Sequence, residues 1–256
     1  MASNEELQKQ LETLISLNRR QTDLLAFAQL GDEKVINFIY RGEHVSMYLP
    51  QGGHDFIQSY IVRQHAFYER RFFDRLLERN IVKPGGVVID AGANIGNHAV
   101  FFGLFLGAKK LICFEPQTAV FETLERNLDL NKIKHKSHRA MLGAEKGRGS
   151  LVSFNPANHG SASFAPKDDG DTPMVSIDSA VSKTDRKAVS FMKIDVEGGQ
   201  LAVLEGARET IAEAQMPIWC EVFKDEADET RAFMEDIGYE DTKMFWSHNY
   251  IFVPKG

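Results

Sequence analysis

The stretch VVIDAGANIG, residues 87–96, places an acid and two glycines directly after a short apolar run. The apolar run predicts a buried β-strand, and the glycines predict a tight turn that leads into a helix. In open α/β sheets, ligands bind beyond the carboxyl ends of the strands. The stretch therefore predicts a ligand site at the end of this strand, with Asp90 beside it.

Segments typical of strands and helices alternate after residue 87. Further strands are predicted at LICFEP, KSHRAML, FMKIDVEG, PIWCEVF and NYIFVP, with amphipathic helical segments between them. Alternating βα units predict an α/β fold with a doubly wound, mostly parallel sheet and helices on both faces. The polar segment from about residue 143 to 173 is rich in Gly, Ser, Asn, Asp and Pro, so we expect an irregular surface excursion there.

Upstream of this domain, residues 1–84 are expected to form a cap, and residues 85–256 the α/β domain. The cap should contain an N-terminal helix, a hairpin around Arg41-Gly42 and a helical stretch from about Phe56 to Asn80. Along the first helix, apolar residues recur at heptad spacing at Leu7, Leu11, Leu14 and Leu25. This pattern leaves two alternatives, a seam for homo-oligomer formation or a helix that packs on its own domain, and the short run favours the second.

The overall composition excludes several classes of protein. The chain has 256 residues, 43% of them hydrophobic, which is too apolar for a disordered chain. Its net charge of −6 provides no positive field for nucleic acid or an anionic membrane. No apolar leader or membrane-length apolar run occurs, so we expect a cytoplasmic protein. Cys113 and Cys220 lie in apolar runs and should be buried, reduced thiols.

Acidic residues end most of the predicted strands. They are Asp90, Glu115, Asp195, Glu197 and Glu221. A single acid of this kind usually caps a helix, but acids on successive strands favour a ligand site. Glu115 follows Gly96 by nineteen residues, where a carboxylate can bind the two hydroxyls of an adenosine ribose. An acid-lined site favours the cationic S-adenosylmethionine over a dinucleotide with its pyrophosphate.

Four segments in order, DAGANIG, FEPQTAVFETLERNLDLN, SIDSAV and KIDVEGGQLAVLEGA, resemble the FkbM-type S-adenosylmethionine-dependent methyltransferases. The resemblance covers roughly residues 65 to 225. It implies a class I methyltransferase fold, Rossmann-like, with a seven-stranded sheet whose last strand is antiparallel. It also implies methyl transfer, usually to a hydroxyl oxygen of a secondary metabolite or a glycan.

The resemblance assigns roles to individual positions. Asp90, Gly92, Asn94 and Gly96 would hold the methionine end of S-adenosyl-L-methionine, Glu115 its ribose, and Tyr68 and Glu69 would lie beside it. Asp195 and Glu197 would be the catalytic residues that face the transferred methyl group. The chain departs from the family at Gln200, where members commonly carry an acid.

The acceptor's proton must be removed during methyl transfer, and several groups could do this. The candidates are Asp195, Glu197, His159 and His248, although Asp195 could instead form an ion pair with Lys193. No spacing of ligands indicates a metal. Two other functions stay open: a protein that binds an adenosine ligand without catalysis, and a nucleic-acid methyltransferase, which the net charge disfavours. We expect a small-molecule or glycan acceptor, and neither a nucleic acid nor a membrane as partner.

Overall fold

The computed structural model describes residues 3–223 and 226–256, which form two compact units. One unit comprises residues 1–68 together with 155–159, and the other comprises residues 69–154 and 160–256. The division between Tyr68 and Glu69 lies upstream of the boundary at residue 84 expected from the sequence. Each unit is described by itself.

The smaller unit contains two helices and a hairpin: α1 (Asn4–Ala28), β1 (Val35–Tyr40), β2 (Glu43–Tyr48) and α2 (Phe56–Gln64). The hairpin is where the sequence predicts it, and both turn residues, Arg41 and Gly42, have the positive φ of a type I′ turn. The rings of Phe38 and Tyr40 pack edge-on against Phe67, at 5.2 and 5.5 Å between centroids. This aromatic cluster forms the core of the unit.

The helical stretch expected from about residue 56 to 80 consists of two separate helices in the structure. α2 ends at Gln64, α3 (Arg70–Arg79) begins after Glu69, and the two helices belong to different units. His65 and Glu69 both have left-handed backbone conformations, with φ of 48° and 61°. A right-handed helix cannot continue through such residues, so the chain breaks between them.

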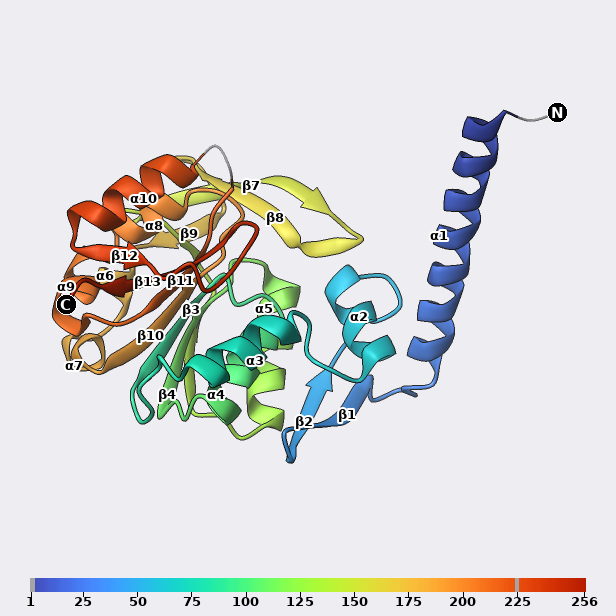
Figure 1. Ribbon diagram of the computed structural model, residues 1–256, viewed down its shortest axis with the longest axis horizontal. Helices are drawn as coiled ribbons and strands as arrows, with labels where there is room; N and C mark the ends of the chain where they lie inside the picture. Colours follow the sequence, from blue (N-terminus) through green and yellow to red (C-terminus); the bar gives the residue numbers. More distant parts are fainter. Residues whose placement is uncertain (1–2, 224–225) are drawn as a thin grey trace. The chain divides into compact units, whose positions relative to one another are not determined.

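The larger unit is built on a central mixed sheet (Figure 1). Over the described residues it has seven strands, in the order β12-β13-β11-β10-β3-β4-β5. The strands are β3 (Val87–Ala91), β4 (Lys110–Phe114), β5 (His135–His138), β10 (Val189–Ile194), β11 (Ile218–Glu221), β12 (Tyr239–Asp241) and β13 (Asn249–Pro254). Pairings from β5 to β11 are parallel, whereas β13 is antiparallel to both neighbours. This confirms the expected class I methyltransferase strand order.

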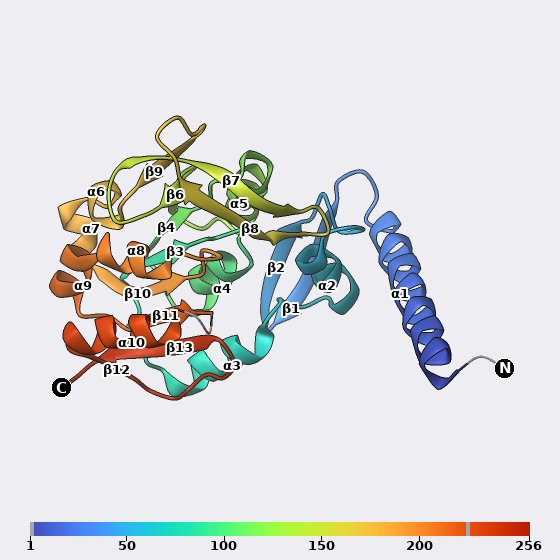
Figure 2. The ribbon, with the colours of Figure 1, turned by 90° about the horizontal axis from the view of Figure 1, so that it is seen from above.

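Helices cover both faces of this sheet (Figure 2). They are α4 (Asn97–Phe105), α5 (Thr118–Leu130), α6 (Ile177–Ala180), α7 (Lys183–Lys187), α8 (Gln200–Glu205), α9 (Arg208–Ala214) and α10 (Ala227–Asp236). On one face, Ile89, Ala91 and Ile194 join a core with α8, α9 and α10. On the other face, Phe191 packs on Phe102 of α4, and Trp219 on Phe72 and Phe73 of α3. Both faces of the central strands are therefore dry.

The expectation of an irregular excursion from about residue 143 to 173 is wrong. β7 (Gly147–Asn155) and β8 (Asn158–Pro166) form a four-stranded sheet with β6 (Met141–Leu142) and β9 (Thr172–Val175), in the order β6-β9-β7-β8. Residues 155–159, where β7 turns into β8, are grouped with the smaller unit. Leu151, Val152 and Phe154 of β7 are exposed. Because backbone pairing and not burial holds these strands, they lack the apolar alternation that predicts a strand.

Cys113 and Cys220 are free and fully buried, which confirms the expectation of buried thiols. They lie on β4 and β11, with β3 and β10 between these strands. Three inter-strand steps correspond to about 14 Å, well beyond the reach of a disulfide. The two side chains also point to opposite faces: Cys113 is the register partner of Asp90, whereas Cys220 is in register with Ile194.

No helix within the described ranges combines the length and the apolarity needed to cross a membrane.

Candidate active site

The loop after β3 is pressed against the backbone that follows β10. Gly92 has a φ of 82°, and a Cβ atom built on it would lie 1.8 Å from the carbonyl oxygen of Asp195. The amide of Asp195 in turn donates to the carbonyl of Ala91. Only glycine fits this position, so the first glycine of the DAGANIG segment joins two strand ends.

Asp90, just before this loop, is a buried carboxylate without a partner. Its side chain is 0% exposed, and within the described residues neither carboxylate oxygen has a hydrogen-bond donor. Burial raises the pKa of Asp90, while the Lys193 ammonium and His98 act in the opposite direction. A buried acceptor of this kind can take hydrogen bonds from a ligand.

Asn94 and Gly96 serve the geometry of the loop. Asn94 has a φ of 49°, its backbone N–H donates to Oε2 of Glu115 at 3.1 Å, and its Oδ1 accepts from the Ile95 N–H. Gly96 is the N-cap residue of α4, and a Cβ atom there would lie 2.9 Å from Cδ1 of Leu124. Gly96 therefore lets α4 and α5 pack closely, which gives it a structural role beside any contact with a ligand.

Glu115 follows β4 and lies at the same loop. Its Oε1 accepts the backbone N–H of Gln117 at 2.8 Å, and its Oε2 accepts that of Asn94. Burial raises the pKa of Glu115 to about 7, although the two backbone donors favour the charged form. The Gln117 side chain also hydrogen-bonds to this carboxylate, which leaves acceptor capacity for about one further hydrogen bond from a ligand.

A buried cation lies one strand away from Asp90. Lys193 is the register partner of both Asp90 and Trp219, so the three side chains form a row on one face of the sheet. Its ammonium is 5.5 Å from the Trp219 ring centroid and 2.6 Å from Oδ2 of Asp195. The side chain is 1% exposed. Burial opposes its charge, but Asp195 and Asp90 outweigh that effect and raise the pKa of Lys193.

The Asp195 ion pair is the alternative that the sequence left open, and the structure shows it. Burial disfavours the charged form of Asp195, but the Lys193 ammonium prevails and lowers its pKa. Glu221, at the end of β11, hydrogen-bonds to Asp195 through its carboxyl group. Burial and the Asp195 charge raise the pKa of Glu221, so Glu221 supplies the proton of this pair.

Glu197, two residues beyond Asp195, has a different environment. Its side chain is only half-buried, and burial together with the Asp195 charge raises its pKa to about 7. Its φ is 46°, and Gly198 and Gly199 after it also have positive φ values, with open space around each. Of the two residues expected to be catalytic, Glu197 is thus the better proton acceptor near neutral pH.

Glu69, the residue before α3, lies close to the charged side chains at the strand ends. Its Oε2 lies 3.0 Å from Nε2 of His98 on α4, and its charge acts on Lys193 and Glu221. The His98 ring packs edge-on against Trp219 at 5.1 Å and against Phe73 at 5.0 Å. The Phe73 and Trp219 rings therefore exclude water on one side of the His98–Glu69 pair.

The sequence did not single out His98, Lys193 or Trp219 as members of this site. A usable signal existed for two of them: Lys193 and Trp219 stand two residues before Asp195 and Glu221, and alternate residues of a strand share a face. His98 had no such signal, because its position depends on how α4 crosses the sheet.

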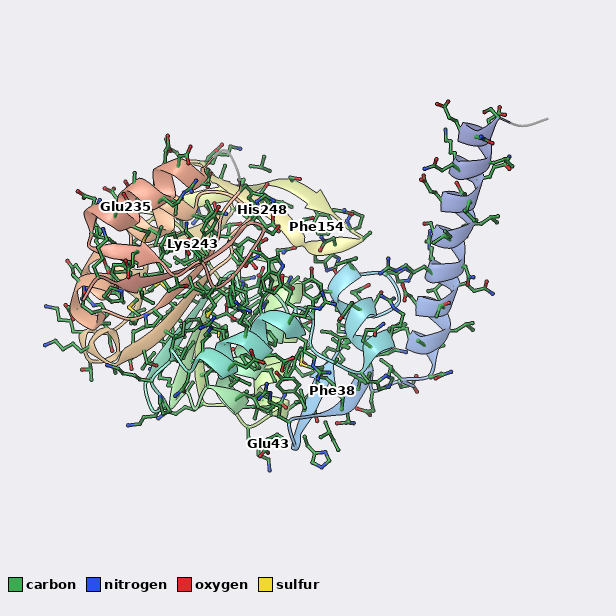
Figure 3. All side chains as sticks on the ribbon, in the orientation of Figure 1. Phe38, Glu43, Phe154, Glu235, Lys243 and His248 are labelled. Atoms are coloured by element: carbon green, nitrogen blue, oxygen red, sulfur yellow. The ribbon has the colours of Figure 1, made fainter. Side chains whose placement is uncertain are left out.

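Other predicted residues have different surroundings. Tyr68 and His159 belong to the smaller unit, where the Tyr68 ring packs edge-on against Phe56 and Tyr60. His248 lies in the loop before β13 and faces the Phe223 ring (Figure 3). Gln200 begins α8 and is fully buried, and both atoms of its amide lack a partner within the described residues.

Acidic side chains outnumber basic ones among the residues described at the strand ends. Glu69, Asp90, Asp195, Glu197 and Glu221 supply acids, whereas Lys193 and His98 are the groups of the described chain whose charges act to lower the pKa of both Asp90 and Asp195. An excess of carboxylates in a dry environment attracts a cationic ligand. Over residues 3–223 and 226–256, no cluster of three or more His, Cys, Asp or Glu side chains has the arrangement of a metal site.

Comparison with known proteins identifies relatives. Methyltransferase 1 of Beauveria bassiana is 24% identical over 159 residues, covering 53% of this chain and 64% of that protein. Methyltransferase sdnD of Sordaria araneosa is 23% identical over 218 residues, covering 71% of this chain and 84% of the relative. The chain thus spans under two thirds of the Beauveria protein.

Two solved structures also match the chain at low sequence identity. Methyltransferase FkbM from Methylobacillus flagellatus KT is 16% identical with a TM-score of 0.47, and the match covers 76% of this chain and 60% of that one. Streptococcus pneumoniae Sp1610, a putative tRNA (m1A22) methyltransferase in complex with S-adenosyl-L-methionine, is 14% identical with a TM-score of 0.46, covering 75% of each chain.

The family model for the methyltransferase FkbM domain matches residues 90–240, from Asp90 through all the strand-end acids described above. This match covers more than half of the chain, so the chain belongs to the FkbM methyltransferase family.

Proposed function

We propose that the protein is an S-adenosyl-L-methionine-dependent methyltransferase that methylates a hydroxyl group of a secondary metabolite or a glycan. The observation that carries the proposal is the dry, acid-rich group at the strand ends, which includes a buried carboxylate without a donor, Asp90. Family membership and the names of both curated relatives support methyl transfer. The hydroxyl acceptor and the cytoplasmic location rest on the sequence alone.

The residues around β3 and β4 fit the methyl donor. Asp90 offers unfilled acceptors to the ammonium group of the methionine end, and the glycine at position 92 keeps the backbone close. Glu115 accepts the backbone N–H groups of Asn94 and Gln117 and a hydrogen bond from the Gln117 side chain, and its remaining acceptor capacity is available to the ribose hydroxyls. Asn94 fixes Glu115 from the side of the loop. We assign Tyr68 and Glu69 to the donor site from the family resemblance.

The chemistry requires little of the protein beyond placement and proton removal. When bound, the donor supplies a methyl group on a sulfonium, which is already an activated leaving group. Glu197 is the proposed general base, because its raised pKa makes it an acceptor for the hydroxyl proton near neutral pH. Asp195, held by Lys193 and Glu221, orients the acceptor oxygen through a fixed carboxylate. Carboxylates in these positions also favour the cationic donor.

A direct test combines binding with transfer. Calorimetry should show that the purified protein binds S-adenosyl-L-methionine, and the variant Glu115→Ala should bind far more weakly than Glu122→Ala, a change on the outer side of α5. Incubation with donor labelled on its methyl group, followed by fractionation of a metabolite and glycan extract, should place the label on an oxygen.

Each other outcome identifies a different function. Binding without transfer into any fraction would make the chain an adenosine-ligand-binding protein on the same fold. Label recovered in RNA or DNA would identify a nucleic-acid methyltransferase. Unchanged binding in Glu115→Ala would reject the ribose assignment.

A further inference from the structure

Helix α1 leaves an apolar stripe uncovered. The helix has 25 residues, and none of them is buried. Leu7, Leu11 and Leu14 are 52%, 58% and 63% exposed, and Leu25 is exposed as well. Side chains project from the helix on all sides, and the rest of its unit does not cover the N-terminal turns (Figure 3). A helix in a protein owes most of its stability to packing of its apolar face, so this stripe requires a cover.

The contacts of α1 with its own unit use another face. Asp23 forms an ion pair with Arg63 of α2, and Phe27 packs over Gly52 and Gly53. Asp23, Ala26 and Phe27 are half-buried, whereas Gln21 and Leu25 beside them are exposed. At 100° per residue, the half-buried face lies more than 90° around the helix from the leucine stripe. Packing within the smaller unit therefore does not compete with a partner on the stripe.

The stripe follows heptad spacing, with leucine at four of its eight core positions and Asn4, Asn18, Gln21 and Ala28 at the others. Positions 4, 11, 18 and 25 are a positions, and 7, 14, 21 and 28 are d positions. Two of the central layers are polar, Asn18 at a and Gln21 at d. A single asparagine at an a position fixes register and favours two strands, because it can hydrogen-bond only to its counterpart. These features describe one seam of a coiled coil.

From this pattern we infer that α1 pairs with α1 of a second copy of the chain as a parallel, in-register dimer. In that arrangement Asn18 faces Asn18, Gln21 faces Gln21, and every leucine layer faces leucine. An antiparallel pairing that matches Leu11 with Leu14 would set Asn18 against Leu7 and leave a polar group unpaired. An antiparallel pairing of Asn18 with Gln21 would match Leu14 with Leu25 but leave Leu7 without a counterpart, so the parallel register is the one that pairs every leucine with leucine.

The charges of α1 agree with a second copy as the partner. The e and g positions that flank the seam carry no charged residue: they are Gln8, Gln10, Ile15, Leu17, Thr22 and Leu24. Two identical helices thus meet without like-charge repulsion. A membrane surface fits less well, because the polar face holds Glu5, Glu6, Glu12 and Asp23 against Lys9, Arg19 and Arg20.

The size of the interface sets its strength. A helix of this length is about 37 Å long and about 10 Å wide, so each copy buries about 400 Å² of surface along one face. The total of about 800 Å² is below the roughly 1,200–2,000 Å² of stable complexes, so the dimer should be reversible and depend on concentration.

Sedimentation equilibrium of the full chain over about 1 to 200 μM tests the inference. We expect a monomer–dimer equilibrium for the wild type, at least tenfold weaker association for Leu14→Asp, and wild-type behaviour for Ser16→Asp, which adds the same charge at an f position. Asn18→Leu should associate more tightly or form larger oligomers, because the polar layer that limits the assembly is gone. Unchanged donor binding shows that each variant is folded.

Cysteine cross-linking tests the orientation. Leu7→Cys at a d position should form a disulfide between two copies, and Lys9→Cys on the opposite face should not. A monomer at every concentration overturns the inference, as does a dimer weakened equally by Leu14→Asp and Ser16→Asp. A dimer that fails to cross-link through position 7 overturns the parallel register, and binding of the monomer to lipid vesicles would replace the second copy by a membrane.

Discussion

Helix α1 and the strand ends of the larger unit both contain side chains that lack suitable contacts within their own unit. At the strand ends a polar contact is missing, and on α1 an apolar one. Within the described residues, Asp90 is buried and has no hydrogen-bond donor, whereas Leu7, Leu11 and Leu14 are apolar and exposed. A buried charge calls for a small polar or charged ligand that enters the fold. An exposed apolar stripe calls for another macromolecular surface. The type of missing contact, polar or apolar, therefore indicates whether the partner is a small ligand or another macromolecule.

The largest expected effect tests the chemistry assigned to the strand ends. Glu197→Gln keeps the shape of the side chain but removes the base, so turnover should fall roughly 10²- to 10⁴-fold. Asp195→Asn should also reduce turnover, with less effect on donor affinity. Single-turnover methylation measures the first quantity and calorimetry the second. Leu14→Asp in α1 should leave turnover per chain unchanged, which is the contrast that separates the two regions.

If both carboxamide variants retain normal turnover, proton removal passes to a histidine or to water. If both lose donor binding as strongly as turnover, the end of β10 belongs to the donor site, and the division of roles between Glu115 and Asp195 is wrong.

A second effect concerns the buried cation. Lys193→Met fills the same space but leaves Asp90 and Asp195 without a neutralising charge, which should lower the free energy of unfolding by about 3 to 5 kcal/mol. Chemical denaturation measures the loss. Lys187→Met, on the exposed side of α7, is the matched control and should change stability by less than about 0.5 kcal/mol. Equal stability of the two variants would mean that the acids do not depend on Lys193.

A third effect tests donor recognition. Glu115→Ala should weaken binding of S-adenosyl-L-methionine by about 2 to 4 kcal/mol, the usual value for charge-assisted hydrogen bonds in a desolvated place. Calorimetry of this variant against Glu122→Ala gives the difference directly. An affinity within twofold of the wild type would place the ribose elsewhere.

The smallest effect is a pH dependence. Burial raises the pKa of Glu115 to about 7, so below pH 7 the free protein holds a proton there. Ribose hydroxyls donate to the charged form, so binding lowers this pKa and releases the proton. Donor affinity should therefore rise by up to about tenfold per unit as pH increases towards 7 and level off above it. Glu115→Gln should remove this part of the dependence.

Calorimetry in two buffers of different ionisation enthalpy counts the protons released at pH 6. Leu14→Asp should match the wild type in this measurement, since α1 is not part of the proposed donor site. Proton uptake on binding, instead of release, would contradict the assignment.

The sequence predicts the central sheet well because buried parallel strands are short apolar runs that end in turn residues. It also places Asp90, Glu115 and Asp195 at strand ends, since the register of parallel strands brings their carboxyl ends to one edge. It misses β7 and β8, whose exposed side chains carry no apolar alternation, and it merges α2 with α3. The contacts of His98 depend on helix–sheet packing, which no local pattern encodes.

Glycine 96 shows a further limit of motif reading. The sequence assigns both loop glycines to ligand approach, but Gly92 adjoins the Asp195 backbone and Gly96 adjoins Leu124. The same residue type thus serves loop closure at one position and helix packing at the other. Only three-dimensional neighbours distinguish these two roles.

The two buried thiols lie on opposite faces of the sheet, so their reactivity can be used to follow the opening of each face separately. Burial raises the pKa of both Cys113 and Cys220, so neither reacts with a thiol reagent until its own layer opens. Cys113 shares the face of Asp90 and α4, and Cys220 shares the face of α8 to α10. The modification rates of the two thiols, followed by mass spectrometry of separate peptides, therefore time the opening of each helical layer independently.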